Sequence, residues 1–137
     1  DIKSKGLSDK NIEITLEYKD LHKLAISSVD VAILLGNALD NAIEAAEKVI
    51  SENIKTIRVY AHIKSDLAVF VIKNPTSNIV DVNNLVTTKD NKHSHGYGIL
   101  SMQNIAKKYE GDVLLEWKDY EFTTRILLNN ISKQTLN

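Results

Sequence analysis

The chain has 137 residues, of which 43% are apolar and 26% charged, and its formal net charge is -1. These values are typical of a globular protein and argue against a disordered chain or a nucleic-acid-binding one. The absence of cysteine excludes disulfides, thiolate metal sites and cysteine nucleophiles. No apolar run approaches the roughly 20 residues of a membrane helix. We therefore expect a single domain spanning residues 1–137, with no direct membrane contact.

The first half of the chain switches between two hydrophobic periods. Residues 11–18 and 56–64 alternate between apolar and polar side chains, which predicts half-buried strands. Between them, residues 31–50 contain no proline and predict a long helix. Residues 67–72 are apolar on both faces, which is typical of a central strand. We expect that strand to end at Lys73-Asn74-Pro75, because proline removes a hydrogen-bond donor.

The second half begins with a long polar stretch. Residues 75–95 show little periodicity, and a loop of this length inside a compact domain is usually functional, so it is a candidate lid. A helix is predicted from residue 97 to residue 109 by its apolar spacing, and residues 113–117 and 122–128 predict a hairpin. The order strand, helix, hairpin, loop, helix, hairpin predicts helices packed on one face of a mixed sheet.

Two asparagines stand out on the long helix. Asn37 and Asn41 are four residues apart and share, with Glu44, an arc of roughly 60° at about 100° per residue. This stripe is either the solvated face of an amphipathic helix or a functional one. Asparagine is a poor helix former, and its carbonyl oxygen suits a hard cation such as Mg²⁺. Both observations favour a functional face over a solvated one. The predicted apolar face opposite consists of Ala32, Leu35, Leu39, Ala42, Ala46 and Val49.

Four segments together resemble one protein family. The sequence NALDNAIEA at residues 37–45 resembles the N box of the ATP-binding domain of sensor histidine kinases, within the GHKL (Bergerat-fold) ATPase superfamily that also contains gyrase and the MutL repair proteins. TTK at residues 87–89 resembles the family's lid sequence, and HGYGI at residues 95–99 resembles its second glycine box. Residues 124–126 resemble its closing T-x-F pattern. The four segments occur in the family's order.

The resemblance implies both a fold and an activity. The implied fold is α+β, a two-layer α/β sandwich with a mixed, mostly antiparallel sheet and helices on one face. The implied function is that of an Mg-ATP-binding catalytic domain, which donates the γ-phosphate of ATP to a histidine on a separate dimerisation domain and acts with a response regulator. The implied ATP-binding residues are Asn37, Asn41, Asn74, Lys89, Gly96, Gly98 and Thr124. Asn37 and Asn41 are the implied catalytic residues, with Asn41 as the Mg²⁺ ligand.

The first glycine box departs from the family pattern. The family has Asp-x-Gly-x-Gly, whereas residues 74–78 read NPTSN. The family's aspartate accepts a hydrogen bond from the adenine amino group, and the side-chain oxygen of Asn74 can do the same, although its NH₂ then needs another partner. This replacement resembles the accessory-gene-regulator branch of kinases, which sense peptide pheromones in quorum sensing. Glu44 is a second departure, because many histidine kinases carry a phosphate-contacting lysine near there.

None of the four histidines has the context of a phosphate acceptor. We therefore expect the accepting histidine to lie outside this chain. The resemblance implies that the chain is a cytoplasmic domain of a membrane-bound sensor. His93 and His95, in the candidate lid, either contact phosphates or are solvated. GHKL enzymes that hydrolyse ATP carry a glutamate at the Asn37 position, and asparagine cannot act as that base. This favours transfer of the γ-phosphate over hydrolysis of ATP. Two alternatives are a serine kinase of the anti-sigma type and a degenerate module for protein interaction.

Overall fold

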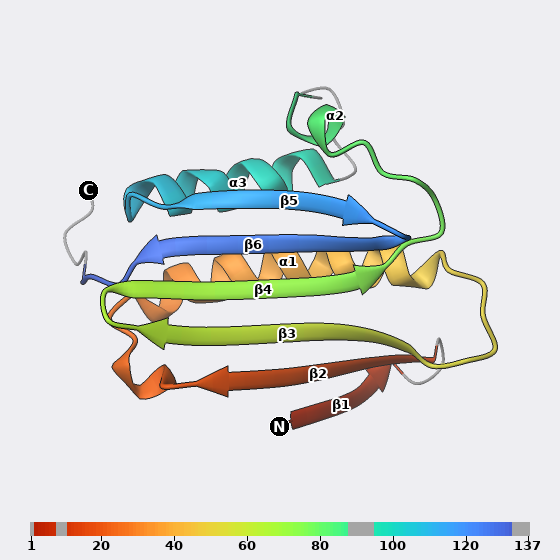
Figure 1. Ribbon diagram of the computed structural model, residues 1–137, viewed down its shortest axis with the longest axis horizontal. Helices are drawn as coiled ribbons and strands as arrows, with labels where there is room; N and C mark the ends of the chain where they lie inside the picture. The colour runs from red at the N-terminus through yellow and green to blue at the C-terminus, as the bar shows by residue number, and fades with distance from the viewer. Residues whose placement is uncertain (1, 8–10, 88–94, 133–137) are drawn as a thin grey trace.

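A computed structural model describes residues 2–7, 11–87 and 95–132. Six strands form one sheet in the order β1-β2-β3-β4-β6-β5, and the helices cover one face of it (Figure 1). The strands are β1 (Ile2–Leu7), β2 (Ile12–Lys19), β3 (Lys55–Lys64), β4 (Leu67–Pro75), β5 (Asp112–Lys118) and β6 (Glu121–Asn129). The helices are the 3-10 helix η2 (Leu21–Lys23) and the α-helices α1 (Ser28–Glu47), α2 (Val82–Thr87) and α3 (His95–Lys108).

The sheet is mixed. β2 and β3 are parallel and joined through α1, as a parallel pair requires a crossover connection. The other four strand pairs are antiparallel. The predicted fold class, an α+β sandwich with helices on one face of a mostly antiparallel sheet, is therefore confirmed. The edge strand β1 was not among the predicted elements. Within the described residues, no helix has the length and apolar character needed to cross a membrane.

The buried face of α1 differs from the predicted one. Ala32, predicted to be apolar core, is exposed, whereas Leu34 and Ala38 are buried together with Ala42 and Ala46. The reason is that α1 packs against α3 as well as against the sheet, so its contact surface is rotated toward α3. Asn37 and Asn41 consequently lie half-buried beside the buried stripe and do not form a solvated face opposite to it.

Strand β4 is longer than predicted, because it continues through Pro75. Residues 73–75 pair with residues 121–123 of β6, while pairing with β3 begins only at Lys73. The backbone N–H of the next residue, Thr76, donates to the carbonyl oxygen of Tyr120 at 2.9 Å. Since backbone groups alternate along a strand, the position without a donor, at Pro75, faces the side where β3 provides no partner. The proline therefore costs the sheet no hydrogen bond.

Helix α3 ends against β6. Glu110 has a left-handed φ of 55°, and the N–H of Gly111 donates to the carbonyl oxygen of Ala106 at 2.8 Å, which satisfies a carbonyl at the helix end. A Cβ atom at Gly111 would lie 1.9 Å from the carbonyl oxygen of Leu127. Glycine is required here by the close approach of β6, which fixes the distance between α3 and the sheet.

Candidate functional site

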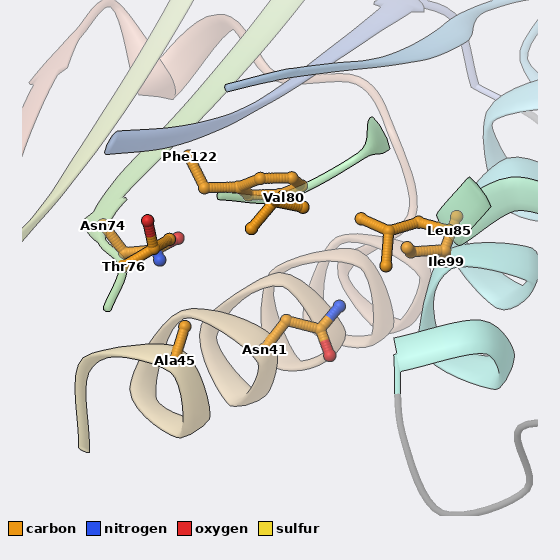
Figure 2. A pocket seen from close by; sticks show the side chains of 8 residues that line it. All are labelled: Asn41, Ala45, Asn74, Thr76, Val80, Leu85, Ile99 and Phe122. Atoms are coloured by element: carbon orange, nitrogen blue, oxygen red, sulfur yellow. The ribbon is translucent and has the colours of Figure 1, made fainter. Parts of the chain in front are cut away.

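A cavity of about 120 Å³ lies between α1, the start of α3 and the ends of β4 and β6. Figure 2 shows Asn74 and Thr76 at one end of this cavity, Asn41 of α1 along one side, and Leu85 and Ile99 at the other end. Most of its lining is apolar, with three polar side chains. This composition is typical of small-molecule sites, in which a few polar groups fix the orientation of a ligand. The lining residues are Asn41, Ala45, Asn74, Thr76, Val80, Leu85, Ile99 and Phe122.

Asn74 is a buried polar residue at the end of β4, with only 3% of its surface exposed. Its Nδ2 donates to the carbonyl oxygen of Pro75 at 3.1 Å, which supplies the partner that the NH₂ group was expected to need. Within the described part of the chain, the structure gives no partner to its Oδ1. A buried carbonyl oxygen without a partner is costly. An oxygen of this kind at the wall of a cavity is available to a hydrogen-bond donor from a ligand or from a water molecule.

Thr76, two residues further on, is also buried and is held by three hydrogen bonds. Its N–H donates to Tyr120, its Oγ1 donates to the carbonyl oxygen of Asn78 at 3.1 Å, and Trp117 Nε1 donates to the same Oγ1 at 2.9 Å. Trp117 and Tyr120 pack edge to face, with their ring centroids 5.4 Å apart. The β5–β6 hairpin therefore fixes the polypeptide where it leaves β4.

The N box and the second glycine box meet at the side of the cavity. A Cβ atom built on Gly98 would lie 3.5 Å from Asn41 Nδ2 and 3.6 Å from Asn37 Oδ1. The backbone of the first turns of α3 is thus open toward the two asparagine side chains, because residue 98 has no side chain of its own. A ligand group placed there contacts both helices.

Other sequence-predicted residues are distributed differently. Thr124 is buried on β6, paired with Ile72 and Leu115, but it is not among the residues that line the cavity. Asn37 lies beside Gly98 without lining the cavity, and Glu44 is half-buried and does not line it either. Gly96 lies in the first turn of α3.

The candidate lid, residues 75–95, is described only in part. Thr76, Val80 and Leu85 from this segment line the cavity, so it forms one wall of the site. Lys89 and His93 lie outside the described residues, as does the side chain of His95. Sequence reasoning did not identify Thr76, Phe122 or Trp117. A threonine at a position where the family pattern has glycine was the one available signal.

A second polar cluster joins α1 and α3 away from the cavity. Tyr109 donates from its hydroxyl to the buried Asp30 carboxylate, and Lys108 Nζ lies 3.0 Å from Asp30 Oδ2. Burial opposes ionisation of Asp30, but the hydrogen bond from Tyr109 and the charge of Lys108 outweigh it, so the pKa of Asp30 is lowered. Burial and the bond to Asp30 raise the pKa of Tyr109 to about 12. The cluster anchors the helix pair whose other end holds Asn37, Asn41 and Gly98.

Comparison with solved structures places the fold among histidine kinase catalytic domains. The nucleotide-free catalytic domain of histidine kinase ThkA superposes with a TM-score of 0.75 at 15% identity, covering 93% of this chain and 86% of that one. A second nucleotide-free form of it gives 0.72 at 17% identity, over 93% and 84%. The Acinetobacter baumannii histidine kinase AdeS gives 0.63 at 13% identity, over 90% of this chain and 57% of that one. At these identities the likeness shows the fold.

A family model provides the sequence-level comparison. The model described as GHKL domain matches residues 26–129, which include α1, the cavity and the β5–β6 hairpin. No curated protein matches the sequence significantly. Because the family model covers most of the chain and the fold agrees with it, the chain belongs to the GHKL domain family, and this membership implies ATP binding.

Proposed function

We propose that this chain is the Mg-ATP-binding catalytic domain of a sensor histidine kinase. It donates the γ-phosphate of ATP to a histidine on a separate dimerisation domain, and a response regulator then receives that phosphate. The observation that carries the proposal is the pairing of a buried, unpartnered acceptor on Asn74 with Asn41 on the same cavity, together with the Gly98 backbone and Asn37 that lie beside Asn41. Such a site fits a ligand with a base at one end and phosphates at the other.

The base occupies the Asn74 end. Phe122, Val80 and Ala45 provide apolar contact for a flat ring, and Asn74 Oδ1 accepts a hydrogen bond from the adenine amino group. Thr124 supports this end from the same face of the sheet, two residues beyond Phe122 along β6. The volume of about 120 Å³ is below the roughly 300 Å³ or more of a complete ligand site. The base therefore enters this cavity while the phosphates extend toward α3.

The phosphates lie between α1 and the start of α3. The amide oxygen of Asn41 suits Mg²⁺, which takes few protein ligands and keeps several waters. The described residues contain no group of three or more His, Asp or Glu side chains that could hold a metal ion. In the proposed site, Asn41 would hold the Mg²⁺ that ATP brings, and the ion would neutralise phosphate charge. In the proposed site, Asn37 and the backbone of Gly96 and Gly98 would contact the phosphates, and Lys89 is the proposed point charge for the γ-phosphate.

Transfer is favoured over hydrolysis. Asn37 has a neutral amide that cannot take a proton from water, so the domain positions ATP and neutralises its charge, the main contributions of proteins to phosphoryl transfer. The NPTSN sequence at residues 74–78 and the N box together support the accessory-gene-regulator branch, with the chain as the cytoplasmic domain of a membrane-bound quorum sensor.

Calorimetry with ATP tests the proposal. Wild type binds ATP more tightly with Mg²⁺ than with EDTA. In Asn41→Ala the Mg²⁺-dependent gain falls by at least about tenfold, because the amide ligand is lost. Asp40→Ala, an exposed position on the same helix, is the matched control and binds like wild type. Equal binding by wild type and Asn41→Ala, or no binding by wild type at millimolar ATP, would count decisively against the assignment.

A further inference from the structure

We infer that Thr76 is a specificity-determining residue and that, with Asn74, it makes the base end of the cavity a hydrogen-bond acceptor that selects 6-aminopurines. Trp117 acts as a positioning residue through Thr76. This inference rests on the proposed nucleotide site and extends it to residues outside the family's pattern, which has glycine where this chain has Thr76. The inference is based on the hydrogen bonds that Asn74 and Thr76 already make inside the protein at the base end of the cavity.

The polarity of Asn74 is fixed by its neighbour. The carbonyl oxygen of Pro75 can only accept, so the side chain of Asn74 must turn its NH₂ toward it, at 3.1 Å. The reverse orientation would bring two oxygens together and leave a buried carbonyl unsatisfied. Asn74 Oδ1 is consequently left as a hydrogen-bond acceptor for a ligand. Asn74 therefore presents an acceptor to the cavity through Oδ1, although an asparagine side chain contains both donor and acceptor groups.

The polarity of Thr76 is fixed in the same way. A hydroxyl has one hydrogen and two lone pairs. The hydrogen is used toward the carbonyl oxygen of Asn78 at 3.1 Å. Trp117 Nε1, which can only donate, takes one lone pair at 2.9 Å and so prevents the hydroxyl from turning its hydrogen elsewhere. The remaining lone pair is an acceptor on a side chain that is 8% exposed and lines the cavity.

Asn74 Oδ1 and the remaining lone pair of Thr76 Oγ1 place two acceptors at one end of the cavity (Figure 2). The exocyclic amino group of adenine carries two hydrogens, one for each acceptor. Hypoxanthine and guanine carry a carbonyl oxygen at the same ring position, which would face two further oxygens in a buried site. Sites built around a specific hydrogen bond reject ligands that lack the matching group much more strongly than apolar pockets reject small changes of size.

The experiment compares ATP with inosine triphosphate, which replaces the amino group with a carbonyl oxygen, by calorimetry in Mg²⁺. Wild type binds ATP at least about tenfold more tightly than inosine triphosphate. In Thr76→Val, which keeps the shape and loses the acceptor, this ratio falls by about threefold or more. Trp117→Phe lowers the ratio as well, since the freed hydroxyl can donate to the carbonyl oxygen. Thr123→Val, a buried threonine on the opposite face of β6, keeps the wild-type ratio.

The outcomes separate this inference from the proposed function. If wild type binds ATP and inosine triphosphate equally, or if the ratio is unchanged in both Thr76→Val and Trp117→Phe, the inference is wrong and the nucleotide site stands. If Trp117 has a purely structural role, Trp117→Phe weakens the binding of both nucleotides alike and leaves the ratio at the wild-type value. That result also overturns the positioning role. If wild type binds neither nucleotide, the proposed function fails and the inference fails with it. Circular dichroism establishes that each variant is folded.

Discussion

The two ends of the cavity are built by different means. At the base end, strands β4, β5 and β6 hold Asn74 and Thr76 through hydrogen bonds to Pro75, Asn78 and Trp117. At the proposed phosphate end, α1 and α3 bring half-buried asparagines against the backbone of Gly98, where an added Cβ atom would be in ordinary van der Waals contact with both side chains. In the proposed site, the base end sets which ligand is recognised, while the phosphate end depends on how α1 and α3 are packed.

Gly98→Ala should disrupt phosphate binding and leave the base end of the cavity intact. The added methyl group would lie 3.5 to 3.6 Å from the side chains of Asn37 and Asn41, which is ordinary contact, so the protein folds normally. The methyl group nevertheless occupies the space proposed for phosphate. We expect the affinity for ATP to fall by about tenfold and the ratio between ATP and inosine triphosphate to stay unchanged, both measured by calorimetry.

Gly36→Ala is the matched control for that experiment. Gly36 is an exposed glycine inside α1, and a Cβ atom there meets nothing within 4 Å. Alanine should stabilise the helix by about 0.5 to 1 kcal/mol without changing nucleotide affinity. If Gly98→Ala binds ATP like Gly36→Ala, the glycine does not approach the phosphates, and the contrast between the two ends loses its support.

The phosphate end was the more predictable from sequence, for a physical reason. Asn37 and Asn41 are related by helical spacing, which is local. Gly98 was marked by its motif. The position of the buried stripe on α1 was not predictable, because contact with α3 decides it and a single-helix pattern does not contain that contact. This is why Ala32 was wrongly placed in the core.

The base end was less predictable, because its contacts join distant parts of the chain. The bond from Trp117 to Thr76 spans 41 residues and depends on the register of β5 with β6, which no local pattern fixes. The extension of β4 through Pro75 likewise depends on which side of the strand lacks a partner. The mixed sheet itself was predictable from the alternating strand periods and the order of the elements.

Tyr109→Phe tests the anchor that holds α3 on α1. Loss of the hydroxyl removes a buried hydrogen bond to Asp30 and should lower the free energy of unfolding at neutral pH by about 1 to 2 kcal/mol. It should leave the ratio between ATP and inosine triphosphate unchanged, because the base end is separate. Chemical denaturation measures the change, and Tyr120→Phe, at an exposed tyrosine, is the control.

The pH dependence of the same variant is a sharper test. The pKa of Tyr109 is about 12 in the folded protein and about 10 in the unfolded chain, so between pH 10 and 12 only the unfolded chain loses this proton. As the pH rises through this range, the ionisation of Tyr109 should therefore lower the free energy of unfolding of wild type by at most about 1.4 kcal/mol per pH unit. The difference in free energy of unfolding between wild type and Tyr109→Phe should become smaller over that range. A constant difference would contradict the burial of the hydroxyl.

The central claim concerns the destination of the phosphate. A protein in which this domain is joined to its histidine-bearing domain should be incubated with ATP labelled in the γ-phosphate, and the labelled product treated with acid and with alkali. The account predicts a label that is lost in acid and kept in alkali, as for a phosphorus–nitrogen bond to histidine, and that is absent in Asn41→Ala. A label kept in acid and lost in alkali would identify phosphoserine and a serine kinase instead. Binding of ATP with no label at all would contradict kinase function altogether.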